Sequence, residues 1–77
     1  MNKARRREIS EVIERLEACK ADLDVLRDEE QECFDNLPEA LQDAEKGETM
    51  QENADDLENA CDEIDNIIES LQEVVDR

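Results

Sequence analysis

A heptad repeat between Met50 and Val75 constrains the fold of this chain more than any other feature. The apolar residues of this stretch lie four and three positions apart in strict alternation, and they are Met50, Ala54, Leu57, Cys61, Ile64, Ile68, Leu71 and Val75. This spacing keeps one apolar edge of a helix facing a partner helix. A second row widens that edge into a stripe typical of helical bundles, and it comprises Ala60, Ile67 and Val74.

The pattern predicts two long helices. The first helix covers about residues 4–34. The residues of its predicted seam are Ile9, Val12, Leu16, Cys19, Leu23, Leu26, Glu30, Cys33 and Leu37. Glu30 stands where an apolar residue belongs, so either the helices splay there or Glu30 reaches solvent. The second helix covers about 49–76. It begins at a capping box, in which Thr49 and Glu52 satisfy two free backbone N–H groups.

Residues 35–48 are predicted to form a compact connector that contains a short helix. Asn36 can cap a new helical turn. Pro38 would lie in the first turn, where its missing N–H costs nothing. Gly47 suits a left-handed cap that closes the connector before the second long helix begins.

The predicted fold class is all-α, an antiparallel helical hairpin that forms a single domain over residues 1–77. With the turn centred near residue 41, the numbers of opposing residues sum to roughly 83, so that Leu26 meets Leu57. The same register brings the bases Arg5–Arg7 beside the acids of residues 69–76. Each of these clusters opposes its own helix dipole, and together they neutralise each other.

One hairpin of this size buries little apolar surface, whereas ordering the chain costs about 1.5 kcal/mol per residue. We therefore expect the protein to form a homodimer with four helices in a bundle. The residues predicted to form the core and the self-association surface are Leu16, Leu23, Leu26, Leu57, Cys61, Ile64, Ile68 and Leu71.

The charge of the chain is strongly negative and unevenly distributed. The net charge is −16, and residues 28–77 contain two bases and nineteen acids. This balance excludes direct binding of nucleic acid or of an anionic membrane, and it favours a protein partner with a basic surface. No apolar run is long enough for a signal peptide or a membrane span, so a cytoplasmic location and reduced cysteines are expected.

The candidate binding site is a ladder of acids on the second helix. Its members follow the same alternating spacing beside the apolar stripe, and they are Asp55, Glu58, Asp62, Asp65 and Glu69, thickened by Asp56 and Glu63. Neighbours lie about 5 Å apart along the axis, which resembles a phosphate backbone in crude electrostatic terms. The alternative is a solvated helix face that keeps the protein soluble. No Lys or Arg interrupts residues 48–76, whereas a merely soluble helix mixes the two signs.

Other chemistry is not indicated. The acids lack the loop spacing of a calcium-binding EF-hand, and no Cys-x-x-Cys pair suggests zinc. Without histidine or another base near any cysteine, we predict no catalytic residue, no metal and no cofactor. Cys19 and Cys61 both fall on the predicted seam, where a redox clasp between adjacent layers is conceivable. Cys33 lies near a helix end and is the expected reactive thiol.

Three stretches resemble a group of small acidic proteins from bacterial phages and prophages. They are the start MNKARRREI, the connector FDNLPEALQDAEKGE, with its most specific part at residues 37–42, and the acidic second helix. The resemblance implies a bacterial or phage setting and no enzymatic activity. In that setting, small acidic proteins often inhibit host defence systems.

Two functions are compatible with these features. The first is a non-enzymatic inhibitor or decoy that mimics nucleic acid, such as an anti-CRISPR, and offers the ladder to a basic, nucleic-acid-binding defence protein. The second is a structural or adaptor coiled-coil protein that acts through its apolar stripe and self-association. Ionic strength separates them, because a contact driven by charge weakens steeply with salt.

Overall fold

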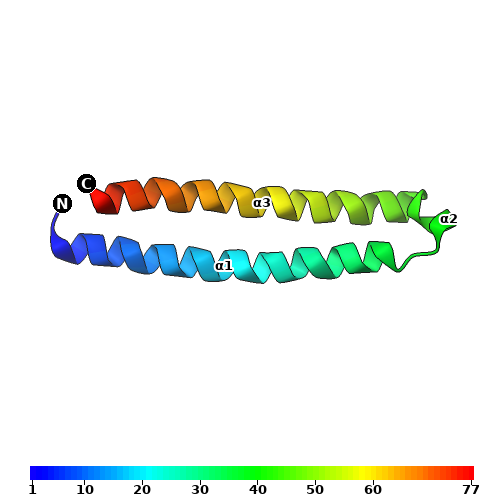
Figure 1. Cartoon of the computed structure of the whole chain (residues 1–77), viewed down its shortest axis with the longest axis horizontal. Helices are drawn as coiled ribbons and strands as arrows, with labels where there is room; N and C mark the ends of the chain where they lie inside the picture. Colours follow the sequence, from blue (N-terminus) through cyan, green and yellow to red (C-terminus); the bar gives the residue numbers. More distant parts are fainter.

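The computed structural model describes all residues, 1–77, as a straight helical hairpin (Figure 1). Helix α1 (Lys3–Asp35) and helix α3 (Glu45–Asp76) run antiparallel, and the single-turn helix α2 (Glu39–Gln42) caps the end away from the two termini. The rod measures 59 × 15 × 12 Å. The prediction of an all-α hairpin with a short connector helix is therefore confirmed.

The seam of α3 is the one that its heptad repeat predicts. Gly47, Ala54, Cys61 and Ile68 are buried at intervals of seven residues, and we assign them to position a of the heptad letters a–g. The d positions are half-buried, and they are Met50, Leu57, Ile64 and Leu71. Burial at both positions means that α3 directs a single edge toward α1.

The seam of α1 differs from the predicted one. Ile13 is buried, and it shares position a with half-buried Lys20, Arg27 and Phe34. The predicted seam residues Cys19 and Cys33 are instead exposed, as is Leu26 at 50%. The d positions Ile9, Leu16, Leu23, Glu30 and Leu37 belong to both seams and are half-buried.

The physical reason for this rotation is the charge of α3. Helix α3 has no base between Glu48 and Asp76. When α1 turns Lys20 and Arg27 into the seam, their aliphatic stems cover apolar surface. The charged end of Lys20 then reaches Asp65 of α3, whereas Arg27 pairs with Asp24 and Asp28 of its own helix. A seam built from Cys19 and Leu26 would turn Lys20 away from Asp65.

The predicted register of the two helices is confirmed. Gln31 and Gln51 lie opposite each other and exchange two side-chain hydrogen bonds of 3.3 and 3.1 Å. About three turns further along, the Cys61 thiol donates to the backbone carbonyl of Lys20 at 4.0 Å. Both contacts fall within about two residues of the register expected for a turn centred near residue 41.

The connector closes the end of α1 differently from the prediction. Asn36 is the C-cap of α1, and it does not start a new turn. Pro38 precedes α2 as its N-cap. The side-chain amide of Gln42 donates to the carbonyls of Phe34 and Leu37 at 3.3 and 3.2 Å. Gln42 thereby ties α2 to the end of α1, where the Phe34 carbonyl also accepts from the backbone N–H of Leu37 at 3.1 Å.

Helix α3 begins four residues before the predicted capping box. Ala44 is its N-cap, so Thr49 lies inside the helix and the capping-box prediction is wrong. The left-handed cap at Gly47 is also wrong, because no glycine has a positive φ. Gly47 is instead buried against α2, where an added Cβ would lie 2.3 Å from the carbonyl oxygen of Gln42. Only a residue without a side chain allows the two helices to approach so closely.

Candidate functional site

The hairpin has two different long faces on either side of its seam. In an antiparallel pair of helices, the e positions of both helices flank one side of the seam and the g positions flank the other. The e residues are Ser10, Glu17, Asp24 and Gln31 on α1, with Gln51, Glu58, Asp65 and Gln72 on α3. The g residues are Val12, Cys19, Leu26 and Cys33 on α1, with Asn53, Ala60, Ile67 and Val74 on α3. One side is thus polar and acidic, and the other is largely apolar.

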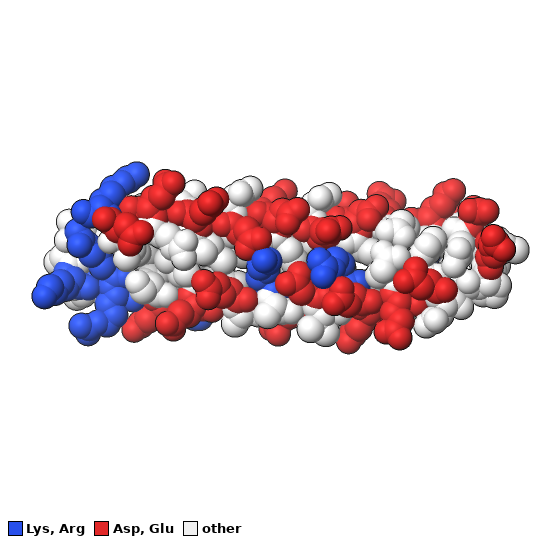
Figure 2. Space-filling view, in the orientation of Figure 1, with Lys and Arg blue, Asp and Glu red and all other residues white.

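We call the first side the carboxylate face and define it by the e and b positions. Its acids are Glu48, Asp55, Glu58, Asp62, Asp65, Glu69 and Asp76 on α3, and Glu14, Glu17, Asp24, Asp28 and Asp35 on α1. All of them are exposed except Asp24, which is half-buried. Figure 2 shows acidic side chains in rows along both helices. The five residues of the predicted ladder, Asp55 to Glu69, therefore lie together on one face.

The row on α1 is a part of the candidate site that the sequence prediction missed. Its acids follow the same alternating spacing of three and four, with Ala21 and Gln31 filling two of the places. The signal was present in the sequence, but the predicted phase of α1 did not separate it from the other acids. The carboxylate face is consequently two rows wide.

Two residues of the predicted ladder fall elsewhere. Asp56 and Glu63 occupy c positions, which lie about 100° around the helix from the b positions and on the side of the g row. Asp56 lines a shallow, open hollow together with Glu30, Asn53 and Leu57. These two acids therefore border the apolar side of the rod and do not thicken the row.

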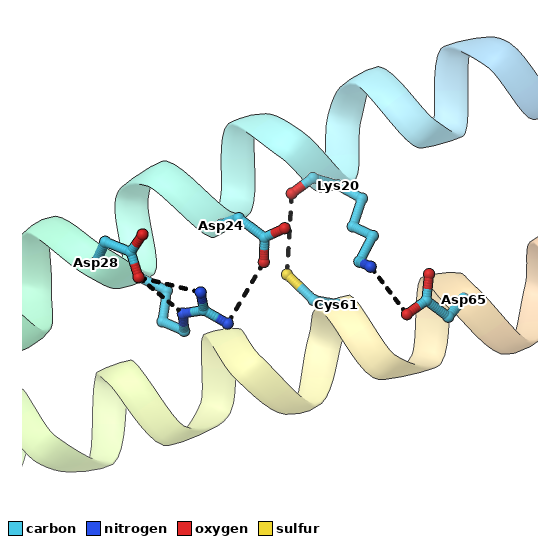
Figure 3. Close-up of polar contacts among 6 residues, drawn as sticks. Lys20, Asp24, Asp28, Cys61 and Asp65 are labelled. Carbon is cyan, nitrogen blue, oxygen red and sulfur yellow. Dashed lines mark hydrogen bonds and ion pairs between the residues drawn. The ribbon is translucent and has the colours of Figure 1, made fainter.

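Two bases of the α1 seam reach into the middle of the carboxylate face (Figure 3). The Lys20 ammonium lies 2.9 Å from the Asp65 carboxylate, and the Arg27 guanidinium lies 3.4 Å from Asp24 and 3.0 Å from Asp28. The hydrogen bond to Asp65 raises the pKa of Lys20, and that to Asp28 raises the pKa of Arg27.

These are the only ion pairs in the structure. They partly neutralise Asp24, Asp28 and Asp65, and they leave the other carboxylates of the face without a cation. Among the unpaired members are Asp55, Glu58, Asp62 and Glu69 on α3. These groups carry most of the negative potential of the face.

The cysteines lie in different environments. Cys61 is buried in the seam, and desolvation raises the pKa of its thiol, so the group remains protonated and unreactive at neutral pH. Cys19 and Cys33 are exposed. Because Cys19 points away from the seam that encloses Cys61, the structure does not support a redox clasp between them.

The basic segment Arg5–Arg7 lies at the same end of the rod as the C-terminus of α3 (Figures 1 and 2). Asn2 caps α1 by accepting a hydrogen bond of 2.8 Å from the backbone N–H of Arg5. No ion pair joins the segment Arg5–Arg7 to the acids of residues 69–76. Any neutralisation between these two clusters therefore acts through space and is sensitive to salt.

The structure contains no group of three or more His, Cys, Asp or Glu side chains placed to hold a metal ion. None of its helices combines the length and the apolar character needed to cross a membrane. No protein-family model, curated protein or solved structure matches the chain.

Proposed function

We propose that this protein is a non-enzymatic inhibitor or decoy that presents its carboxylate face to the basic surface of a nucleic-acid-binding protein. A phage anti-defence role, of the anti-CRISPR kind, fits the resemblance of the sequence to acidic phage proteins. The observation that carries the proposal is the pair of carboxylate rows on a single face of a straight rod 59 Å long. A basic groove built for a nucleic acid needs a partner of that charge and shape.

The charge density of the face supports this mimicry. A complete row holds two carboxylates per heptad, or about one per 5 Å at 1.5 Å rise per residue. One strand of duplex DNA carries a phosphate about every 3.4 Å. The unbroken stretch from Asp55 to Glu69 is therefore about two-thirds as dense as a DNA strand, and the row on α1 is sparser because Ala21 and Gln31 fill two of its places.

The proposal is tested by capture from a nuclease-treated bacterial lysate at physiological salt. The bait variant has four carboxylates of the face replaced, as Asp55→Asn, Glu58→Gln, Asp62→Asn and Glu69→Gln. Its matched control loses the same number of charges elsewhere on α3, as Glu52→Gln, Asp56→Asn, Glu63→Gln and Glu73→Gln. Asp65 remains in both variants because it pairs with Lys20.

We expect the native bait and the control to retain a nucleic-acid-binding protein that the face variant loses. Duplex DNA should elute that protein, because it competes for the same basic groove. Equal capture by all three baits would contradict the proposal. Equal loss from both variants would show that net charge, and not the carboxylate face, governs binding.

A second candidate function is favoured by the other face. Leu26 and Ile67 are each 50% exposed in the g rows, about 15 Å apart along the rod at 1.5 Å per residue, and exposed large apolar residues mark a contact surface. This arrangement supports a structural or adaptor protein that works through apolar contacts and self-association. A partner bound in this way would remain bound at high salt, whereas a partner of the carboxylate face would dissociate.

A further inference from the structure

We propose that the g rows form a homodimer interface in which a second copy of the chain packs antiparallel to the first, with α1 on α1. We call this surface the apolar face, and its members are Val12, Cys19, Leu26 and Cys33 on α1 and Ala60, Ile67 and Val74 on α3. This inference is independent of what the carboxylate face binds.

The area that the hairpin exposes is the first argument. The single chain exposes 5764 Å², whereas a compact monomer of 8.9 kDa exposes about 4,800 Å². The excess of roughly 950 Å² is close to the ~800 Å² that each partner buries in an interface of standard size. Only five residues of the monomer are buried, so pairing through one face would provide the core that the hairpin lacks.

The distribution of charge around the rod selects the apolar face as the contact. Seven of its eight g positions on α1 and α3 hold apolar or cysteine side chains, and the eighth is Asn53. The c positions that border this row on α1 are charged, and they are Glu8, Arg15, Asp22 and Glu29. Beyond them, the outward f positions of α1 include Ala18 and Val25, the latter 56% exposed. The carboxylate face could not pair with a copy of itself, because like charges repel across a desolvated contact.

The distribution of charge along the rod selects the antiparallel orientation. The connector end, residues 28–55, carries one base and eleven acids, whereas the terminal end, residues 1–15 and 67–77, carries six bases and six acids. Parallel packing would bring two strongly acidic ends together. Antiparallel packing places each acidic end beside the end that holds Lys3 and Arg5–Arg7, which Figure 2 shows as a basic cluster.

The position of Cys19 makes this geometry testable. A two-fold axis that lies in the interface plane, perpendicular to the rods, packs α1 of one copy on α1 of the other. Residues near this axis then contact their own counterparts in the second copy. Cys19 lies midway along α1, which covers Lys3–Asp35. With the axis at Cys19, the two copies of Cys33 lie about 42 Å apart along the rod at 1.5 Å per residue.

Such a dimer would display two carboxylate faces, one on each outer side. Both apolar faces would be covered, and both acidic faces would remain open to solvent. The dimer would thus present the rows to two partners, or to two basic surfaces of one partner.

Sedimentation equilibrium of the full chain, in reducing buffer at physiological salt, is the first test. We expect a dimer in the micromolar range, and we expect Leu26→Ser combined with Ile67→Ser to weaken association on the order of tenfold or more. The matched control is Leu41→Ser, since Leu41 is 48% exposed but lies on α2, away from the interface. A native monomer at every concentration, or equal association of the double variant, would overturn the proposal.

Thiol cross-linking with a short bismaleimide is the second test, and each of its variants replaces one thiol of the apolar face with a hydroxyl of similar size. The Cys33→Ser variant, which retains Cys19, should yield covalent dimers. The Cys19→Ser variant, which retains Cys33, should not. Buried Cys61 is present in both variants and is protected. Efficient cross-linking through Cys33 would overturn the antiparallel arrangement.

Discussion

Gly47 shows how one residue sets the geometry of a helix junction. It is the third residue of α3, it has ordinary helical backbone angles, and it is buried beneath α2. An added Cβ would lie 2.3 Å from the carbonyl oxygen of Gln42 and 2.6 Å from that of Leu41. The glycine is therefore needed for close packing, and its conformational freedom is not used.

We predict that Gly47→Ala destabilises the fold even though alanine favours helices by about 1 kcal/mol. Overpacking against a backbone that cannot move freely costs about 1 to 3 kcal/mol, so we expect a net loss on the order of 1 kcal/mol. Urea unfolding followed by circular dichroism measures the effect. Thr49→Ala is the control. This substitution should leave the free energy of unfolding unchanged or raise it slightly. A loss of about 1 kcal/mol in that free energy would instead show that Thr49 caps the helix.

Cys61 is buried, whereas the other two thiols are exposed. We predict that Ellman's reagent modifies Cys19 and Cys33 rapidly and Cys61 only when the fold opens. Modification of all three thiols at one rate would contradict the buried position of Cys61. Liquid chromatography and mass spectrometry of the peptides would assign each rate.

The raised pKa of Cys61 also predicts a loss of stability in alkali. Because the folded-state pKa lies above the ordinary value of 9.0, the stabilising contribution is complete below that pH. It is lost as the pH rises through the folded-state pKa. Lys20, whose pKa is also raised, adds a loss of the same sign above its ordinary value of 10.5. Between pH 8 and 10, stability of Cys61→Ala should therefore fall less than that of the native chain.

At the scale of the helices, the phase of α1 could not be predicted from its own sequence. Helix α1 has apolar side chains in three rows, with Ile13 and Phe34 at a, Leu16 and Leu23 at d, and Leu26 at g. Any two adjacent rows make an acceptable seam. The observed choice brings Lys20 to Asp65 of α3, and that contact is a property of the pair of helices. By contrast, α3 has one continuous seam, and its repeat alone predicted which edge is buried.

The phase of α1 leads to a prediction about two apolar residues. Ile13 is 7% exposed, and Ile13→Ala should destabilise the hairpin by about 2 to 4 kcal/mol. Leu26→Ala should lower the free energy of unfolding much less in dilute solution, where the chain is monomeric. The loss should be larger at high concentration, where association contributes to stability. The comparison requires urea titrations at two protein concentrations. If Leu26→Ala destabilised the chain more than Ile13→Ala in dilute solution, the seam through Cys19 and Leu26 would be the correct one.

At the scale of the whole molecule, the hairpin and its register follow from the heptad repeat and from the charges at the two ends. The candidate site was predicted only in part. The spacing of Asp55, Glu58, Asp62, Asp65 and Glu69 placed them in one row from the sequence alone. The second row on α1 depends on how α1 is rotated, and so does the separation of the acids from the apolar face.

The net charge of −16 on a rod only 15 Å wide predicts that salt stabilises the free protein. At 0.01 M ionic strength the Debye length is about 30 Å, so repulsion acts along much of the rod, whereas at 0.1 M it is about 10 Å. Three surface ion pairs contribute too little to reverse this effect. The melting temperature should therefore rise with NaCl, and it should rise less in the variant that lacks four carboxylates of the face.

A complex formed through the carboxylate face should respond to salt in the opposite direction, since its attraction is screened by the same ions that relieve the repulsion within the rod. Melting curves of the free chain and binding curves of the captured partner, measured over one series of NaCl concentrations, would show both trends. A melting temperature that falls with salt would mean that attraction between charges, including the basic cluster at the terminal end, outweighs repulsion in the folded state. An affinity that is insensitive to salt would instead place the partner on the apolar face, where it would compete with the second copy of the chain.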